Sequence, residues 1–281
     1  MGSTALVLGG GGHVGGAWMT GVLSGLCDAG VDPSRADVVI GTSAGAIFGS
    51  RLLAGEPARE LYERQLARAD GVGLDVTLTQ TLRFLWAALG SRDPERSVLR
   101  LGHAALKART GPESDVYDAL APLLRSLGGW PDRALWITAV DAHSGQLAAF
   151  DADSDVTLVE AVVASCAVPV VWPPITLRGR RWMDGGSRAT ANIHLARGHH
   201  HVLAIAPIPA AVGPHPGAEQ QAAVLAAEGA HVTLVTPDRA ARRAMGRDLT
   251  SDARRPAAAR AGHAQATALA ASVHAVWRAE R

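Results

Sequence analysis

Short runs of apolar residues alternate with longer helical patterns along this chain of 281 residues. Continuous runs rich in Val, Ile and Leu are typical of strands that are covered on both faces, and helices commonly connect such strands. The strand-like runs lie at 5–8, 37–40, 134–140, 201–206 and 231–235. The alternation predicts an α/β fold, in which a mostly parallel sheet lies between two layers of helices.

The stretch between the second and third strand-like runs, about 57–127, carries no strand pattern, and Gly90 and Gly111 divide it. It predicts a helical insertion. One apolar stripe at helical spacing in this stretch is formed by Leu78, Leu82, Leu85, Trp86 and Leu89. Because such a stripe usually packs against a core, we expect these side chains to be buried, in preference to forming a lid or a membrane-facing surface.

A chain of this length can bury one large core, since single α/β domains often exceed about 200 residues. We therefore predict one domain over residues 1–281. Its core spans 5–210, the run 175–181 forms a hairpin, and an alanine-rich helical segment at about 254–281 packs on the sheet.

Charge and cysteine usage limit the partners and the compartment. The formal net charge is only +1, so nucleic acid is not an expected partner, and any contact with a membrane surface is expected to be transient, local and apolar. Strand-like residues begin at Ser3 with no charged leader before them, which predicts a cytoplasmic protein. Cys27 and Cys166 lie in apolar helical patterns, which predicts buried free thiols. The oligomeric state stays open.

The strongest local signal is a G-x-S-x-G motif, Gly41-Thr42-Ser43-Ala44-Gly45. It follows the strand-like run 38–40 and precedes the helical run 46–48, which is the context that a nucleophilic serine on a strand-to-helix turn requires. Gly41 and Gly45 relieve crowding in so sharp a turn, and the helix N-terminus favours developing negative charge. The motif predicts Ser43 as a nucleophile, and the alternative is a turn with a serine cap.

A second glycine-rich turn, Gly9 to Gly12 with Gly15 and Gly16 beyond it, also joins a strand to a helix. Its pattern satisfies G-x-G-x-x-G, so its amides could bind a dinucleotide pyrophosphate or stabilise an oxyanion. A dinucleotide site of the Rossmann type expects an acidic residue at the end of the second strand. That strand runs into Ser43 instead, and we therefore prefer the oxyanion interpretation.

Asp184 lies on a tight turn with Gly185 and Gly186, directly after the predicted hairpin. Asp-Gly-Gly alone is weak evidence, because Asp and Gly favour turns in any protein. A carboxylate in a water-poor turn has a raised proton affinity, so it can accept the proton of a serine hydroxyl and later return it to a leaving alcohol. That chemistry needs no metal and no organic cofactor.

The order of these elements resembles the patatin-like phospholipase family: a glycine-rich loop, then G-x-S-x-G, then Asp-Gly-Gly. The stretches 164–169 and 184–196 also resemble that family, so the likeness extends from about Leu6 to Pro207. It implies a three-layer α/β/α fold and a serine hydrolase that cleaves the carboxylic esters of lipids.

The resemblance also implies roles for single residues. By similarity, Ser43 is the nucleophile, Asp184 is the general base and then the acid, and no histidine takes part. The oxyanion hole is implied for the amides of Gly10, Gly11 and Gly12. Supporting positions in the three motifs are Gly15, Gly41, Gly45, Gly185 and Gly186. The expected partner is a lipid or another acyl ester.

Two alternatives and one departure remain. An α/β-hydrolase with a Ser-His-Asp triad could use a later histidine such as His231, but too few strands precede Ser43 for that fold. A binding module could hold a nucleotide or an anion without turnover. The run 199–201 contains three histidines but lacks the accompanying ligands of a metal site.

Val14 stands where the family commonly has Arg or Lys, so we expect neutral esters to be cleaved at least as well as phospholipids.

Overall fold

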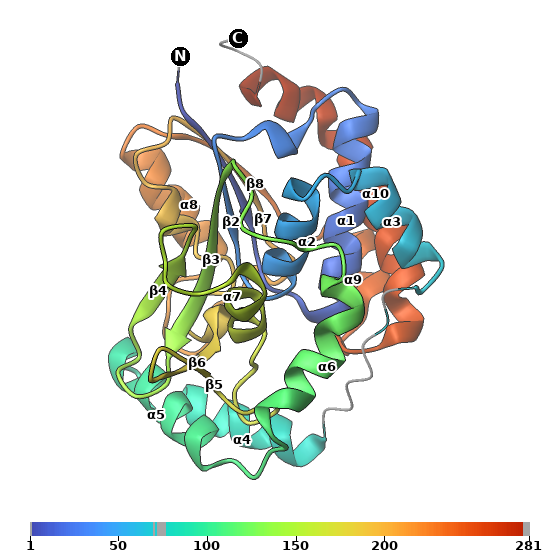
Figure 1. Ribbon diagram of the computed structural model, residues 1–281. Coiled ribbons are helices and arrows are strands. Elements are labelled where there is room, and N and C mark those ends of the chain that lie inside the picture. The colour runs from blue at the N-terminus through green and yellow to red at the C-terminus, as the bar shows by residue number, and fades with distance from the viewer. Residues whose placement is uncertain (1, 70, 72–76, 278–281) are drawn as a thin grey trace.

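The computed structural model describes residues 2–69, 71 and 77–277. Its centre is a sheet of eight described strands (Figure 1). Five of them run parallel in the order β3-β2-β1-β7-β8. Their bounds are β1 Thr4–Leu8, β2 Val38–Gly41, β3 Ala134–Asp141, β7 His201–Ile205 and β8 His231–Val235. These are the strand-like runs of the sequence, and the prediction of a mostly parallel sheet is confirmed.

Three antiparallel strands extend the sheet at β3. The predicted hairpin consists of β5 (Ile175–Leu177) and β6 (Arg180–Asp184), and β6 pairs with β3. Its two turn residues, Arg178 and Gly179, have φ angles of 49° and 75°, as a tight hairpin turn requires. The third strand, β4 (Leu147–Phe150), also pairs with β3. The sequence does not predict β4, because a run of four residues with two alanines has little strand propensity.

Helices cover both faces of the sheet. Leu6 and Leu8 of β1 join one apolar cluster with α1 (Gly12–Asp28), α2 (Ala44–Leu53) and α7 (Leu158–Ser165). Ala5 and Val7 point the other way, into a cluster with α8 (Ala218–Ala227). The remaining short elements are α9 (Arg239–Met245) and the 3-10 turns Pro33–Arg35, Gly185–Ser187, Ile193–Ala196 and Asp252–Arg254. The three-layer α/β/α fold is thus confirmed.

The C-terminal helix α10 (Arg255–Trp277) packs mainly on α1 and only slightly on the sheet. The prediction that this segment packs on the sheet is therefore wrong for most of the helix. A Cβ on Gly21 of α1 would clash with the carbonyl of Ala259, and a Cβ on Gly262 of α10 would clash with the carbonyl of Trp18. The two backbones therefore approach closely through small residues. Ala259 and Ala266 are the alanines of α10 that lie at this contact.

The predicted insertion between β2 and β3 is helical. After α2 it contains α3 (Ala58–Leu66), α4 (Leu78–Leu89), α5 (Pro94–Lys107) and α6 (Glu113–Leu124). The predicted breaks are confirmed, because Gly90 ends α4 and Gly111 lies between α5 and α6. In Figure 1, α4 and α5 lie together at the lower end of the molecule, away from the end marked N. None of the described helices is both long and apolar enough to cross a membrane.

The apolar stripe on α4 does not pack against a core, and this prediction is wrong. The exposed fractions are 58% for Leu82, 43% for Leu85, 71% for Trp86 and 65% for Leu89. The side chain of Leu78 lies outside the described residues. The buried side of the helix is instead formed by Ala87 and Ala88. Helical spacing shows that a helix has an apolar face, but it does not show what covers that face.

Candidate active site

Ser43 lies at the sharp turn between β2 and α2. Its backbone angles are φ 53° and ψ −117°, a conformation that residues other than glycine rarely adopt and that is common at functional sites. Two contacts hold this turn in place. The amide of Ser43 donates to the hydroxyl of Ser165 at 2.8 Å, and a side chain on Gly45 would clash with the carbonyl of Leu8. This hydrogen bond and this close backbone contact therefore hold Ser43 in its strained conformation.

The register of β3 brings Asp184 to the same place. Ile137 of β3 pairs with Gly41 at the end of β2, while Ala139 pairs with Asp184 at the end of β6. The two candidate residues, 141 positions apart in the numbering, thus meet beside one strand. The Ser43 hydroxyl is close enough to the Asp184 carboxylate to favour its ionised form, and the amide of Gly186 donates a hydrogen bond to the same carboxylate at 2.7 Å.

Burial sets the proton affinity of this carboxylate. Asp184 is only 6% exposed, and the loss of solvation raises its pKa to about 6, against the opposing effect of the nearby Ser43 hydroxyl and Gly186 amide. A carboxyl group with a pKa near neutrality can both accept and return a proton. No histidine is among the groups that affect the pKa of Asp184.

The glycine loop lines one side of a cleft that contains both candidate residues. Gly10, Gly11 and Gly12 share this cleft with Ser43 and Asp184. The amide of Gly10, however, donates to the carbonyl of Thr190 at 2.7 Å. Among the described residues, the amides of Gly11, Gly12 and Ala44 have no hydrogen-bond partner. Three N–H groups near Ser43 are therefore available to an incoming oxygen atom, and the amide of Gly10 is not one of them.

A buried asparagine, Asn192, links the turn at Ser43 to the turn at Asp184 through hydrogen bonds. Asn192 adopts a left-handed conformation, with φ 49°, and is fully buried. Its side-chain amide lies 3.1 Å from the Thr42 hydroxyl and 3.1 Å from the Gly185 carbonyl. Thr42 in turn shares a 2.8 Å hydrogen bond with Thr138 of β3. Asn192 therefore connects the residue before Ser43 with the residue after Asp184.

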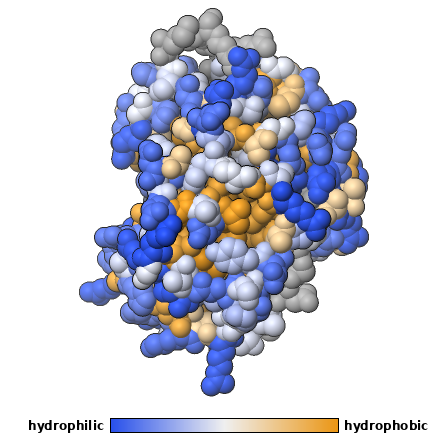
Figure 2. All heavy atoms as spheres, viewed as in Figure 1, coloured by the Kyte–Doolittle hydropathy of each residue, from blue (hydrophilic) through white to orange (hydrophobic). Residues whose placement is uncertain are grey.

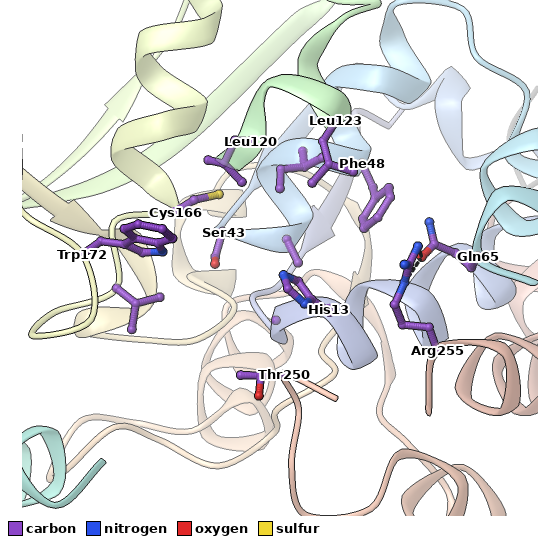
Figure 3. Close-up of a pocket in the computed structure, with 14 residues that line it drawn as sticks. His13, Ser43, Phe48, Gln65, Leu120, Leu123, Cys166, Trp172, Thr250 and Arg255 are labelled. Atoms are coloured by element: carbon purple, nitrogen blue, oxygen red, sulfur yellow. Dashed lines mark hydrogen bonds between the residues drawn. The ribbon is translucent and has the colours of Figure 1, made fainter. Parts of the chain in front are cut away.

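Ser43 also opens onto a second, mainly apolar pocket. Its apolar wall comes from α2 and α6, and from the loop after α7: Ala44, Ile47, Phe48, Leu120, Leu123, Cys166, Val168 and Trp172. Figure 3 shows Trp172 and Arg255 on opposite sides of this pocket, with Ser43 and His13 between them. On the molecular surface, apolar residues gather in the middle of the face drawn in Figure 2, around α2, α6 and α7.

The polar end of the pocket is lined by Arg255, Gln65 and His13. Arg255 is 1% exposed, and its guanidinium donates to Gln65 at 2.8 Å and to Asp252 at 2.7 Å. Burial lowers the pKa of His13, although a hydrogen bond with the backbone of Thr250 opposes this effect. This end of the pocket therefore presents a histidine whose charged form burial disfavours and an arginine whose charge is already paired with Asp252.

The histidine of the triad alternative lies at the wrong edge of the sheet. His231 begins β8 and pairs with His201, which begins β7 and pairs with Thr4 at the start of β1. Ser43 follows the opposite, carboxyl ends of the parallel strands. His231 is therefore separated from Ser43 by the length of the strands, and it stacks on His201, with ring centroids 5.3 Å apart.

The family description "Patatin-like phospholipase" matches residues 6–197, about two thirds of the chain. The chain belongs to the patatin-like phospholipase family. Membership supports a lipid hydrolase function. No curated protein matches the sequence significantly.

Two solved structures are similar at low identity. The first is VipD from Legionella pneumophila, with 16% identity, 66% of this chain covered, 46% of that chain covered and a TM-score of 0.37. The second is the type III effector protein ExoU, with 16% identity, 97% of this chain covered, 53% of that chain covered and a TM-score of 0.45. The chain thus spans about half the length of each of them.

The sequence predicts the residues of the turns at Ser43 and Asp184, but it does not predict the residues that hold these turns in place. Ser165 and Asn192 carry no local pattern that assigns them a role, because each acts on a residue more than 100 positions away. Both lie in stretches that resemble the family, which is the one signal that could have marked them.

Proposed function

We propose that this protein is a serine-dependent lipid acyl hydrolase in which Ser43 and Asp184 form a catalytic dyad. The observation that carries the proposal is that Ser43 and the buried Asp184 carboxylate line one cleft, beside each other. Ser43 lies where an apolar pocket and this cleft with unpaired amides meet. Family membership supports the reaction class, and the dyad is our assignment.

In the first half of the reaction, Asp184 accepts the proton of Ser43 while the serine Oγ attacks the ester carbonyl carbon. The carbonyl π bond opens, and its electron pair moves onto the carbonyl oxygen. When the tetrahedral intermediate collapses, the bond to the alcohol oxygen breaks and Asp184 returns the proton to that oxygen. In the second half, Asp184 accepts a proton from water as the water oxygen attacks the acyl carbonyl carbon. When the bond between that carbon and the serine Oγ breaks, Asp184 returns the proton to Oγ and the carboxylic acid is released.

The negative oxygen of the tetrahedral intermediate needs preorganised donors. We assign this role to the amides of Gly11 and Gly12 and add the amide of Ala44 at the start of α2. Gly10 leaves the predicted set, because its amide is bonded to Thr190. Removal of one such donor typically costs about 3 kcal/mol of transition-state stabilisation. The helix N-terminus that follows Ser43 adds to the same effect.

The two cavities accommodate different parts of the substrate. The pocket between α2 and α6 has apolar walls and accommodates the acyl chain. The cleft along the glycine loop accommodates the ester carbonyl and the alcohol portion. Each requirement of the reaction is met by groups of the chain itself, so the proposal includes neither a metal nor an organic cofactor.

The test is hydrolysis of p-nitrophenyl esters, monoacylglycerols and phospholipids, together with labelling by a fluorophosphonate probe. Ser43→Ala should abolish both, because only an activated serine reacts with that probe. Ser50→Ala is the matched control, since Ser50 is a buried serine of the same helix whose hydroxyl donates to the carbonyl of Ala46.

The control should keep both signals. Full turnover in a folded Ser43→Ala protein would refute the proposal. If the wild type binds nucleotides or anions but neither hydrolyses esters nor reacts with the probe, the binding-module alternative holds instead.

A further inference from the structure

Helix α4 presents an apolar face to solvent. We call Leu82, Leu85, Trp86 and Leu89 the α4 face. Their spacing places these four side chains on one side of the helix, and their exposed fractions range from 43% to 71%. Among the described residues, they are four of the five exposed large hydrophobic side chains, and the fifth is Val224 on α8. A contiguous exposed apolar patch of this kind marks an interaction surface.

The opposite side of the same helix borders the candidate active site. Phe84 lines the cleft that contains Ser43 and Asp184. The side chain of Gln80 reaches the carbonyl of Val170, next to Pro169 of that cleft, at 3.4 Å. Helix α4 thus has one side at the border of the cleft and the other side in solvent. Whatever covers the α4 face is placed at the rim of the cleft.

The segment that carries the α4 face is basic. Residues 77–100 contain two acidic residues, Asp93 and Glu95, and four arginines. Both acidic side chains are already engaged, since Asp93 caps the start of α5 at 2.7 Å and Glu95 pairs with Arg188. The arginines of this segment are Arg83, Arg92, Arg96 and Arg100.

Arg100 packs on Trp86, which is the most exposed residue of the α4 face. The guanidinium carbon of Arg100 lies 4.6 Å from the centre of the Trp86 ring, a cation–π distance. Tryptophan and arginine side by side are typical of groups that lie at the boundary between lipid headgroups and acyl chains. The helix has 12 residues, which is too short to span a bilayer and suits a position parallel to its surface.

We propose that the α4 face docks the protein on a phospholipid surface, with the rim of the Ser43 cleft against the headgroups. This inference rests on the proposed function, because it names the phase from which the lipid substrate is taken. The apolar side chains enter the acyl region and the arginines face lipid phosphates. A phospholipid surface fits better than a second copy of the chain, because the segment that carries the patch has an excess of arginine over acidic residues, one arginine contacts the patch, and the helix adjoins a site for lipids.

The primary test measures binding without turnover. A Ser43→Ala protein is mixed with vesicles of phosphatidylcholine, or of phosphatidylcholine and phosphatidylglycerol in equal parts, and the bound fraction is measured by flotation. Adding Leu82→Gln, Trp86→Gln and Leu89→Gln together should lower partitioning to both vesicles by about tenfold or more. Arg83→Glu should weaken binding to the vesicles with phosphatidylglycerol only. Val224→Gln is the matched control and should change nothing.

The second readout uses the catalytically competent protein. The triple variant should hydrolyse a monomeric soluble ester at the wild-type rate and lose about tenfold of its activity on vesicles. Because the substituted side chains are exposed, the melting temperature should stay unchanged. Wild type that hydrolyses soluble ester but does not bind vesicles overturns the docking proposal alone. A wild-type dimer that the triple variant dissociates also overturns it, because a second copy then covers the face.

Discussion

The two cavities that meet at Ser43 are built in different ways. The apolar pocket is walled by side chains of α2 and α6, such as Phe48, Leu120 and Leu123. The cleft on the other side is made largely of backbone, with Gly10 to Gly12 and Gly186 in its wall. Side chains can change in size while the fold persists, whereas backbone amides keep their direction only if the loop stays intact. The cleft should therefore govern the rate of reaction, and the pocket should govern the choice of acyl chain.

A change in the glycine loop should have the largest effect. Gly12 has φ 59° and a Cβ there would lie 3.0 Å from the carbonyl of Leu249, so Gly12→Val should displace the oxyanion amides. We expect kcat to fall by about 10²-fold to 10³-fold with little change in KM. Gly55→Val is the matched control, because Gly55 also has a positive φ, 95°, but nothing lies near its Cβ. An unaltered kcat in folded Gly12→Val protein would remove the loop from the mechanism.

Loss of the contact behind the nucleophile should have an intermediate effect. Ser165→Ala leaves the buried amide of Ser43 without its acceptor, and an unpaired buried amide costs about 1–3 kcal/mol. We expect kcat to fall about tenfold while fluorophosphonate labelling continues at a reduced rate. Steady-state kinetics and labelling time courses measure both effects. A Ser165→Ala enzyme as fast as wild type would show that the turn holds Ser43 without this bond.

A change in the apolar pocket should alter the selectivity for acyl-chain length and leave the rate of the chemical step unchanged. Leu120 is 7% exposed and lines the acyl pocket, so Leu120→Phe should fill part of it. The kcat/KM for long-chain p-nitrophenyl esters should fall about tenfold, while that for the acetate ester should stay within about twofold. An equal loss for all chain lengths would contradict the division of the substrate between pocket and cleft.

The smallest effect is expected for the headgroup. Val14 is fully buried in the core, so this position places no cation at the cleft. Neutral glycerides should be cleaved at least as well as anionic phospholipids of the same chain length. The comparison uses monomeric short-chain substrates, which removes the contribution of docking to vesicles. A large preference for the anionic lipid under these conditions would show that another cation of the chain serves the headgroup.

The sequence predicts the turns at Ser43, Asp184 and the glycine loop because their chemistry needs glycine where backbones almost touch. Gly45 against the carbonyl of Leu8 is one such contact. The same local pattern does not predict the roles of Ser165 and Asn192, because each contacts the turn at Ser43 from more than 100 residues away. Pairing across such distances follows from the register of β3, which no local pattern encodes.

Helix α4 shows a different limit. Its period of apolar residues correctly predicts a helix with an apolar face, yet the face is exposed. Burial is a property of the partner as well as of the helix, and among the described residues only Arg100 is seen to stack on this face, which stays exposed. The alanine-rich helix α10 gives the converse case, because the close contact with Gly21 depends on residues of both helices.

The pH dependence of hydrolysis also follows from the cleft. Burial raises the pKa of Asp184 to about 6, and the general base must be ionised. Below that pH the carboxyl group is mostly protonated, so kcat/KM should fall about tenfold per pH unit as the pH falls below about 6. A histidine base with a lowered pKa, such as His13, would also give a loss of activity on the acid side. The pH profile alone does not separate the two mechanisms.

The direct test is a comparison of Asp184→Asn and His13→Gln across that pH range, with Ser43→Ala as the reference for complete loss. If the dyad operates, Asp184→Asn is nearly as inactive as Ser43→Ala. His13→Gln then keeps most of its turnover, its fluorophosphonate labelling and the acid limb near pH 6. The contrary result is a folded His13→Gln protein that loses turnover and labelling to the level of Ser43→Ala, because a histidine would then be the base.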